Sequence, residues 1–172
     1  VGWLEILRSE DVNPDYISYS SYDATNPFKT EDDLNKNLKE ALSYLESKLS
    51  PKPDLPNGKR VWIGEYGNPS SKYSDEEQNT RSIWTIKAGL EWGTPFILYW
   101  EMYNNEIKAK TGDQVGYWLI TDKGKKQPIW HTHNEFYRES NQFLEQYIGV
   151  KNQLPDFETY SQAALEFKSL NP

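Results

Sequence analysis

The sequence predicts an α/β domain in which a parallel sheet is covered by helices. Two apolar runs, residues 60–66 and 95–101, have the length and composition of buried strands, and a helix-length segment separates them. Strand-like and helix-like segments alternate along the chain in the order β-α-β-α-β-α, which is typical of parallel sheets. At 172 residues, the chain is expected to form one domain with its own core.

The first strand is expected near residues 15–22, where tyrosine, isoleucine and serine favour an extended backbone. Residues 3–9 before it have the pattern of the last turns of a helix. Residues 23–28 after it contain an Asn-Pro pair and are expected to form a loop. The first β-α unit therefore begins near the N-terminus of the chain.

The first long helix is expected to begin after Thr30, because a threonine can cap a helix and acidic residues fill the next turn. Leucines recur at helical spacing as far as Leu49. Two prolines in residues 51–53 and a Pro-Asn-Gly turn at 56–58 then predict a turn-rich link. This link leads into the second strand at 60–66.

The second long helix has clear start and stop signals. Residues 74–77 read Ser-Asp-Glu-Glu, a capping box in which the serine and the second glutamate satisfy the first free amides. Gly93 is placed to end the helix in the left-handed conformation that glycine favours. The third strand, residues 95–101, follows after a short turn.

The C-terminal part is expected to be helical after a long polar loop. Residues 102–127 contain three glycines and one short extended piece, residues 117–121. Pro128 occupies a natural first helical position, and the helix is expected to run until Gly149 ends it. An amphipathic helix at 158–167 closes the chain.

Composition excludes several classes of function. The net charge of −7 argues against nucleic acid or an anionic membrane as a partner, and no run of 18 apolar residues could span a bilayer. The absence of cysteine excludes disulfides, a thiolate nucleophile and a cysteine-ligated zinc site. There is no phosphate-binding loop and no Ser-His-Asp arrangement, so no cofactor and no metal are expected.

Three residues at strand ends are candidates for chemistry. Glu65 ends the second strand between two glycines, Tyr22 ends the first, and Trp100 ends the third. The carboxyl ends of parallel strands meet at one edge of a sheet, where α/β proteins carry their sites. One site would then contain the Glu65 carboxylate, the Tyr22 hydroxyl that can orient it, and the flat ring of Trp100 that can stack on a sugar.

Side-chain alternation predicts which other residues share the face of Glu65. These are Val61 and Ile63 in the second strand, Phe96 and Leu98 in the third, and Ser18 and Ser20 in the first. Trp62 and Tyr66 are expected to face the surrounding helices, and Glu101 to bond a helix or loop on the opposite side.

Ordinary structural roles compete with these assignments. A glutamate at a strand end can be a solvated loop residue, and strands favour aromatic side chains in any case. The pair His131 and His133 lies near the start of a helix, where residues two apart diverge. A surface or helix-packing role is therefore expected for this pair, rather than metal binding.

The chain resembles the C-terminal part of the clan A (β/α)8 glycoside hydrolases, which include cellulases and mannanases. Ser20-Ser21-Tyr22-Asp23 is similar to the family's His-x-Tyr-Asp, except that Ser20 replaces the histidine. Glu65-Tyr66-Gly67 is similar to the nucleophile motif of strand seven, and Trp100 to the tryptophan that ends strand eight. The glycine-rich run before Pro128 is similar to the lead into helix eight. The resemblance covers roughly residues 15–148.

The resemblance implies the C-terminal portion of a (β/α)8 TIM barrel, with strands six to eight in residues 1–172. It implies retaining hydrolysis of O-glycosidic bonds in a plant-type or microbial polysaccharide or oligosaccharide. Glu65 would be the nucleophile and Tyr22 would orient it. The residues expected to contact the sugar are Trp100, Ser20, Tyr66 and Asn68. Secretion or a cell-envelope location follows from such a substrate.

The acid/base glutamate of the family, at the end of strand four, has no counterpart in this sequence. Retaining hydrolysis needs two carboxylates about 5–5.5 Å apart, so the chain alone is expected to be inactive. The apolar start, from Val1 to Leu7, suggests that further barrel residues precede it, and these would be its partner. The alternatives are a non-catalytic carbohydrate-binding protein and a partial barrel that associates with itself.

Overall fold

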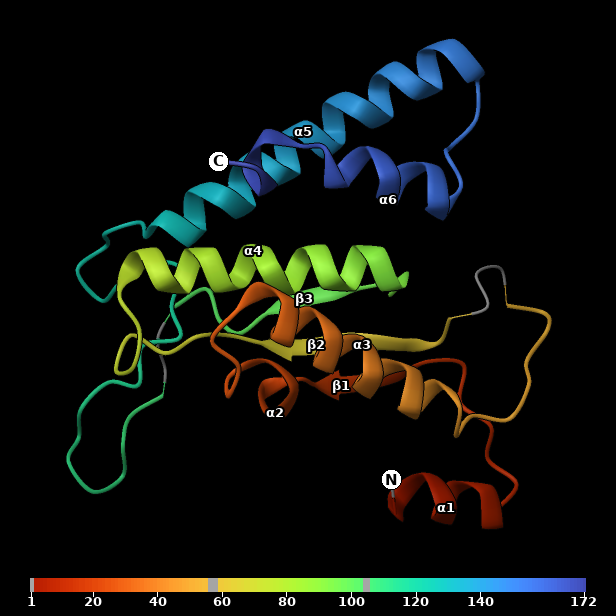
Figure 1. The fold of residues 1–172 in the computed structure, drawn as a ribbon, viewed down its shortest axis with the longest axis horizontal. Helices are drawn as coiled ribbons and strands as arrows, with labels where there is room; N and C mark the ends of the chain where they lie inside the picture. The colour runs from red at the N-terminus through yellow and green to blue at the C-terminus, as the bar shows by residue number, and fades with distance from the viewer. Residues whose placement is uncertain (1, 56–58, 104–105) are drawn as a thin grey trace.

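The computed structural model describes residues 2–55, 59–103 and 106–172, and within them the chain is a mixed α/β protein with a small parallel sheet (Figure 1). Val1 and the predicted turn at 56–58 lie outside the described residues, as do residues 104–105 of the long loop. The predicted α/β class and the parallel sheet are confirmed.

The sheet contains three parallel strands in the order β1-β2-β3: β1 (Ile17–Ser20), β2 (Val61–Tyr66) and β3 (Ile97–Tyr99). The first and third are shorter than the sequence predicts. Within the described residues neither edge strand has a further strand beside it, so the sheet is open and no closed barrel is present.

The sequence predicts that Tyr22 ends the first strand. In the structure, Tyr22 instead begins the short helix α2 (Tyr22–Thr25). The last ladder bond runs from Ser21 N to Glu65 O, at 2.8 Å. The backbone then turns, because the amide of Ala24 and the hydroxyl of Thr25 both donate to the carbonyl of Ser21, at 3.0 and 2.9 Å. The expected loop at 23–28 is therefore partly helical.

Helices α3 (Glu31–Glu46) and α4 (Asp75–Trp92) begin where their caps predict, and α4 ends where Gly93 predicts. Helix α3 ends at Glu46, before the last leucine of the predicted pattern, Leu49. In α3, the Thr30 hydroxyl accepts a hydrogen bond from the backbone amide of Asp33. In α4, both halves of the capping box with Ser74 are formed, and Gly93 ends the helix at φ 92°. Both signals are local in sequence, which is why they are reliable.

The C-terminal elements follow the prediction with two corrections. Helix α5 (Pro128–Lys151) continues through Gly149, because the left-handed residue that caps it is Asn152, at φ 54°. Helices α1 (Gly2–Ser9) and α6 (Phe157–Leu165), with a 3₁₀ turn η1 (Lys168–Leu170), complete the fold. The expected extended piece at 117–121 forms only isolated bridges, from Ile120 to Tyr103 and Lys126.

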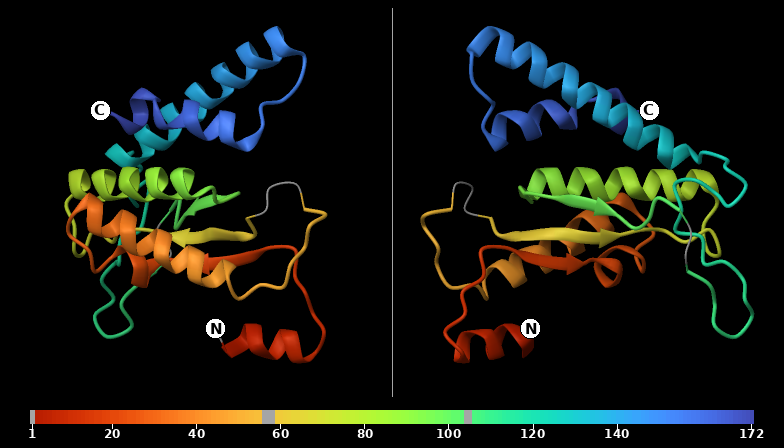
Figure 2. Two further views of the ribbon diagram at one scale, coloured as in Figure 1. Left: turned by 45° about the vertical axis from the view of Figure 1, so that its right-hand side comes forward. Right: turned by 180° about the vertical axis from the view of Figure 1, so that it is seen from behind.

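The helices cover one face of the sheet and leave the other open (Figure 2, right). The core lies on the covered face, where Val61 and Ile63 are fully buried with leucines of α3 and isoleucines of α4. Phe96 and Leu98 lie on the open face and are 53% and 50% exposed. Trp62 meets Phe96 edge-to-face at 5.7 Å on the same open side.

These positions correct the predicted faces of β2, because Val61 and Ile63 face the helices and Trp62 does not. The reason is a bulge: Tyr19 pairs with Ile63, but the next residue, Ser20, pairs with Glu65. Gly64 is therefore an extra residue in β2. The prediction counts back from Glu65 in steps of two, and it therefore assigns Val61 and Ile63 to the face of Glu65. Because of the extra residue, both lie on the opposite face.

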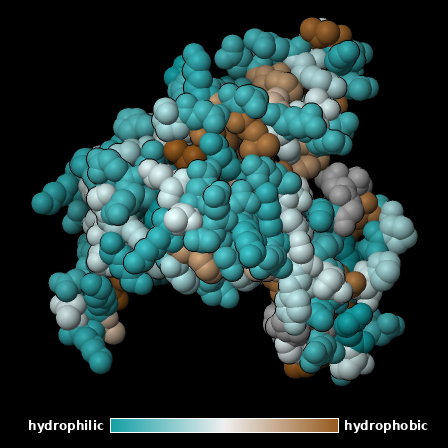
Figure 3. Space-filling view, in the orientation of Figure 1, coloured by the Kyte–Doolittle hydropathy of each residue, from teal (hydrophilic) through white to brown (hydrophobic). Residues whose placement is uncertain are grey.

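Apolar side chains also gather between α4 and the pair α5–α6, as Figure 3 shows on the face seen in Figure 1. A groove of 420 Å³ lies between the edge of β3 and these helices. Its lining includes Phe96, Leu98, Phe136, Tyr137 and Phe157. This groove and the open sheet face are the main apolar surfaces that the described residues leave uncovered.

Candidate functional site

Glu65 lies at the C-terminal edge of the sheet and faces its open side. Tyr66 next to it is buried on the helix side, so the alternation of the strand turns Glu65 the other way. The bulge that allows this needs a glycine, because a Cβ on Gly64 would lie 1.8 Å from the hydroxyl of Ser18. Glu65 is half-buried, and Ser20 pairs with it in register.

Tyr22 is the direct neighbour of Glu65. Burial, then the negative charge of Glu65, and a hydrogen bond with the same carboxylate raise the pKa of the Tyr22 hydroxyl far above its usual value of 10.0. The phenol therefore keeps its proton beside Glu65. Tyr22 reaches Glu65 from α2 and not from the strand.

Trp100 joins the site through the end of β3. Its backbone amide donates to Tyr66 O at 2.8 Å, and its peptide bond to Glu101 is cis. The strand ends are close because residue 67 is glycine, since a Cβ there would lie 2.4 Å from the carbonyl oxygen of Trp100. The indole is half-buried and its nitrogen donates to the carboxylate of Glu106 at 2.9 Å.

Two residues of the site were missed by the sequence analysis, Glu106 and Tyr117, both in the long polar loop. The ring of Tyr117 meets that of Tyr22 edge-to-face at 5.6 Å. Burial and the charge of Glu106 raise the pKa of Tyr117. The one available signal was that this loop leaves the sheet directly after Trp100, at the edge that carries Glu65.

The backbone of Glu101 bonds the same loop. Its amide donates to Tyr117 O, and its carbonyl accepts from the amide of Leu119, both at 3.0 Å. The loop is thus attached to the end of β3 by backbone hydrogen bonds. This attachment holds Tyr117 beside the strand ends.

The structure corrects the prediction that Tyr66 contacts the sugar, because its side chain is buried. It is 1% exposed and lies between the sheet and α5. Its hydroxyl lies 2.9 Å from His133 Nε2, and its ring packs edge-to-face against Tyr99 at 5.2 Å. His133 therefore packs a helix against the sheet, as predicted for the histidine pair.

His133 is expected to make stability depend on pH. Its Nδ1 donates to Ile129 O at 2.8 Å, so the neutral ring accepts from Tyr66 at Nε2. Burial lowers the pKa of His133 below its usual 6.5. The unfolded chain then binds the proton more strongly, so stability is complete above pH 6.5 and falls as the pH drops below it.

Urea unfolding at pH 7.5 and pH 5.5 checks this prediction. His133→Gln is expected to reduce the difference between the two midpoints, whereas His131→Gln, at an exposed position, should leave it as in the unmodified chain. Equal pH dependence in both variants would contradict the role given to His133.

The structure also corrects the prediction that Asn68 contacts the sugar. It is 2% exposed, and its side chain bonds Ser82 and Arg81 within the protein, at 3.3 and 3.0 Å. It supports the loop after Glu65 and does not line the site. Its position in a strand-end loop predicted exposure, but α4 covers it.

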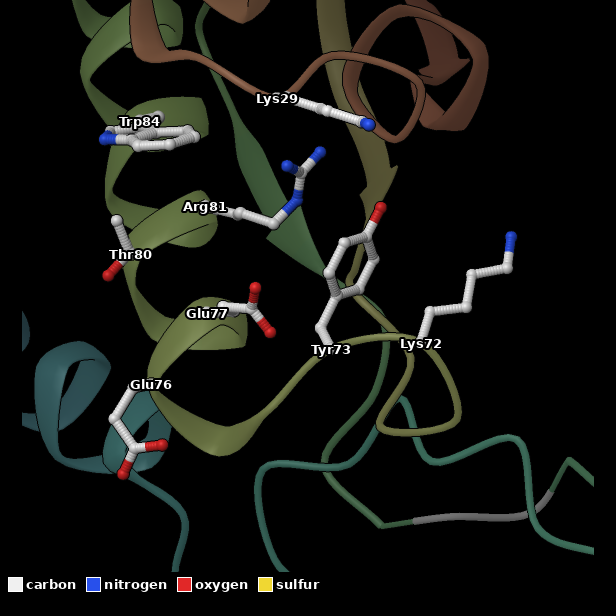
Figure 4. Close-up of a pocket in the computed structure, with 8 residues that line it drawn as sticks. All are labelled: Lys29, Lys72, Tyr73, Glu76, Glu77, Thr80, Arg81 and Trp84. Atoms are coloured by element: carbon white, nitrogen blue, oxygen red, sulfur yellow. The ribbon is translucent and has the colours of Figure 1, made fainter.

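Arg81 ties this loop to the loop after α2 through its hydrogen bonds, and Figure 4 shows its side chain beside the ring of Tyr73. Its guanidinium donates to the carbonyl oxygens of Thr25, at 2.8 Å, and Phe28, at 2.7 Å. It also lies 4.6 Å from the centre of the Tyr73 ring. The pocket in Figure 4 borders this contact, but each guanidinium nitrogen already donates to a protein oxygen.

The site thus brings together Ser20, Tyr22, Glu65 and Trp100 of the predicted set and adds Glu106 and Tyr117. Among the described residues, no group of three or more His, Asp or Glu side chains could hold a metal ion. None of the helices in those ranges has the length and apolar character needed to cross a bilayer. No family model, curated protein or solved structure matches the chain.

Proposed function

We propose that this chain is the C-terminal part of a retaining glycoside hydrolase with a (β/α)8 barrel, and that Glu65 is its nucleophile. The observation that carries the proposal is the position of Glu65 at the C-terminal edge of a parallel sheet, where the chain that pairs with it leads directly into Tyr22. A nucleophilic carboxylate needs a donor that fixes one oxygen and leaves the other for the anomeric carbon. Trp100, beside them, supplies an aromatic ring for the sugar.

The open sheet supports the barrel part of the proposal. Both edge strands lack partners within the described residues, and Phe96 and Leu98 are about half exposed on the open face. Additional parallel strands would pair the edges and bury this face, as barrel closure does. Alternatively, a second copy of the chain could cover the open face and pair the edge strands. Light scattering of the isolated chain distinguishes a dimer from a monomer.

The general acid is assigned to residues outside this chain. In the proposed reaction Glu65 attacks the anomeric carbon and a second carboxyl group protonates the leaving oxygen. Water then releases the sugar from Glu65, with the second group acting as base. In the described residues the carboxylate of Glu106 also lies at this edge, but one of its oxygens already accepts the indole N–H of Trp100.

Covalent trapping tests the nucleophile directly. The complete protein is treated with β-glycosyl fluorides that carry a second fluorine at C2, in the gluco, manno and xylo series. Fluoride leaves without protonation, and the C2 fluorine slows release, so the glycosyl-enzyme accumulates. Peptide mapping is expected to find one added sugar, on Glu65.

Two variants control the trapping experiment. Glu65→Gln should take up no label, while Glu76→Gln, at an exposed position of α4, should be labelled like the unmodified protein. Label on another carboxylate would overturn the assignment. A protein that binds the sugars without reacting would favour the non-catalytic carbohydrate-binding alternative.

Tyr22→Phe is expected to lower kcat roughly 10- to 100-fold, because a hydrogen bond to a charged group contributes about 1.5–3 kcal/mol. The substitution removes only the hydroxyl and leaves the ring against Tyr117. Tyr117→Phe is the matched control, since no hydrogen bond joins its hydroxyl to Glu65. Initial rates on an aryl glycoside measure both, and equal rates for the two variants would contradict the role of Tyr22.

A further inference from the structure

Glu106 is held in a fixed place beside the site. Its carbonyl oxygen accepts from the amide of Val115 at 3.1 Å, and Ile107 forms an antiparallel bridge with Gln114. The loop thus doubles back on itself at its base and presents the Glu106 side chain to Trp100. The carboxylate accepts the indole N–H at 2.9 Å.

Glu106 also lies near the residues that surround Glu65. Its charge is one of the causes that raise the pKa values of Tyr22 and Tyr117. None of the ion pairs formed by the described residues involves Glu65 or Glu106. The Trp100 indole is therefore bonded to a carboxylate, and neither that group nor Glu65 is paired with a lysine or arginine in the described part of the chain.

We propose that Glu106 is a positioning and specificity-determining residue: it holds the N–H edge of the Trp100 indole toward the loop, and its charge disfavours sugars that carry a carboxylate. The first part follows from the chemistry of the pair. An indole N–H can only donate and an ionised carboxylate can only accept, so the bond fixes the direction of the N–H and disfavours the flipped ring. A sugar that stacks on this ring is then oriented relative to Glu65.

The second part, which rests on the proposed function, follows from charge. A neutral sugar donates its hydroxyls to carboxylates, whereas a uronate brings a like charge into a half-buried site where repulsion is weakly screened. Like-charge contacts are an effective means of rejecting a ligand. The site is therefore expected to prefer neutral sugars over uronates.

Nuclear magnetic resonance of the indole groups tests the positioning role without any sugar. The Trp100 indole signal is identified by its loss in Trp100→Phe. Glu106→Ala is expected to move this signal upfield while the other indole signals stay in place. Glu106→Gln keeps an acceptor for the indole N–H and should move the signal less than Glu106→Ala does. A Trp100 signal unchanged in Glu106→Ala would overturn the proposal.

Binding titrations of the complete protein test the selection. The probes are a β-1,4-linked gluco-oligosaccharide and the β-1,4-linked glucuronate oligomer of the same length, which differ only at C6. The unmodified protein should prefer the neutral probe roughly tenfold at low salt. Glu106→Gln keeps an acceptor for the indole and should lose most of this preference. An unchanged preference in Glu106→Gln would overturn the selectivity.

The two tests separate this inference from the proposed function. If neither probe binds the unmodified protein, the selectivity is contradicted, and covalent trapping on Glu65 decides the hydrolase proposal separately. The indole signal still decides whether Glu106 positions Trp100. If both probes bind equally but Glu65 is trapped covalently, the hydrolase proposal stands and the selectivity is wrong.

Discussion

Glu65→Ala is expected to lower kcat/KM of the complete protein roughly 10⁴-fold or more, because the loss of a nucleophile removes the covalent route altogether. The substitution leaves the strand intact. The ladder bond of β2 to Ser21 uses the carbonyl oxygen of residue 65 and not its side chain. Thermal unfolding of the variant should therefore stay close to that of the unmodified protein.

Chemical rescue gives this prediction a second measurement. Removal of the carboxylate leaves space on the face of the sugar where Glu65 would attack. Azide can occupy this space and attack an activated aryl glycoside, giving a glycosyl azide of inverted configuration. Glu76→Ala should show neither loss nor rescue. Near-normal hydrolysis by Glu65→Ala would contradict the assignment of the nucleophile.

The helices could be predicted because their signals are contained in a few neighbouring residues. Thr30, Ser74 and Gly93 each act within one turn of the backbone, so the sequence alone indicates where α3 and α4 begin and where α4 ends. Gly149 shows the limit of this argument. A glycine ends a helix only where the left-handed conformation is adopted, and here Asn152 adopts it.

The faces of β2 could not be predicted, because the bulge at Gly64 depends on a partner strand 44 residues away in the chain. One extra residue reverses the alternation, so Glu65 lies on the open face although Val61 and Ile63 do not. The sequence showed a glycine before Glu65. Only the pairing of Ser20 with Glu65 shows that this glycine is the extra residue.

Burial decided the other differences at the site. Tyr66 and Asn68 follow Glu65 in sequence, but α4 and α5 cover both, and polar partners within the protein satisfy them. Glu106 lies in a loop with no periodic pattern, so only the three-dimensional contact with Trp100 identifies it. Proximity in sequence was a poor guide to this site, and position at the edge of the sheet was a good one.

Arg81→Met is expected to be the most destabilising single change among the polar residues of the core, by about 3 kcal/mol. Arg81 is 5% exposed and its three guanidinium nitrogens all donate to protein oxygens. Methionine keeps an apolar side chain in place of the arginine stem but has no hydrogen-bond donor. The carbonyls of Thr25 and Phe28 would then be left without this partner in a place that water reaches poorly.

The same change should disturb the site, since Arg81 joins the two loops that position the Tyr22 and Glu65 pair. Thr25 is the last residue of the helix that Tyr22 begins, and Asn68 follows the strand that carries Glu65. Arg81→Lys keeps one charged donor and should lose less stability. Urea unfolding measures all variants against Arg138→Met, whose side chain is 72% exposed and whose effect should stay within about 0.5 kcal/mol. Equal unfolding midpoints for Arg81→Met and Arg138→Met would show that the carbonyls find other donors, and that the two loops are held together without Arg81.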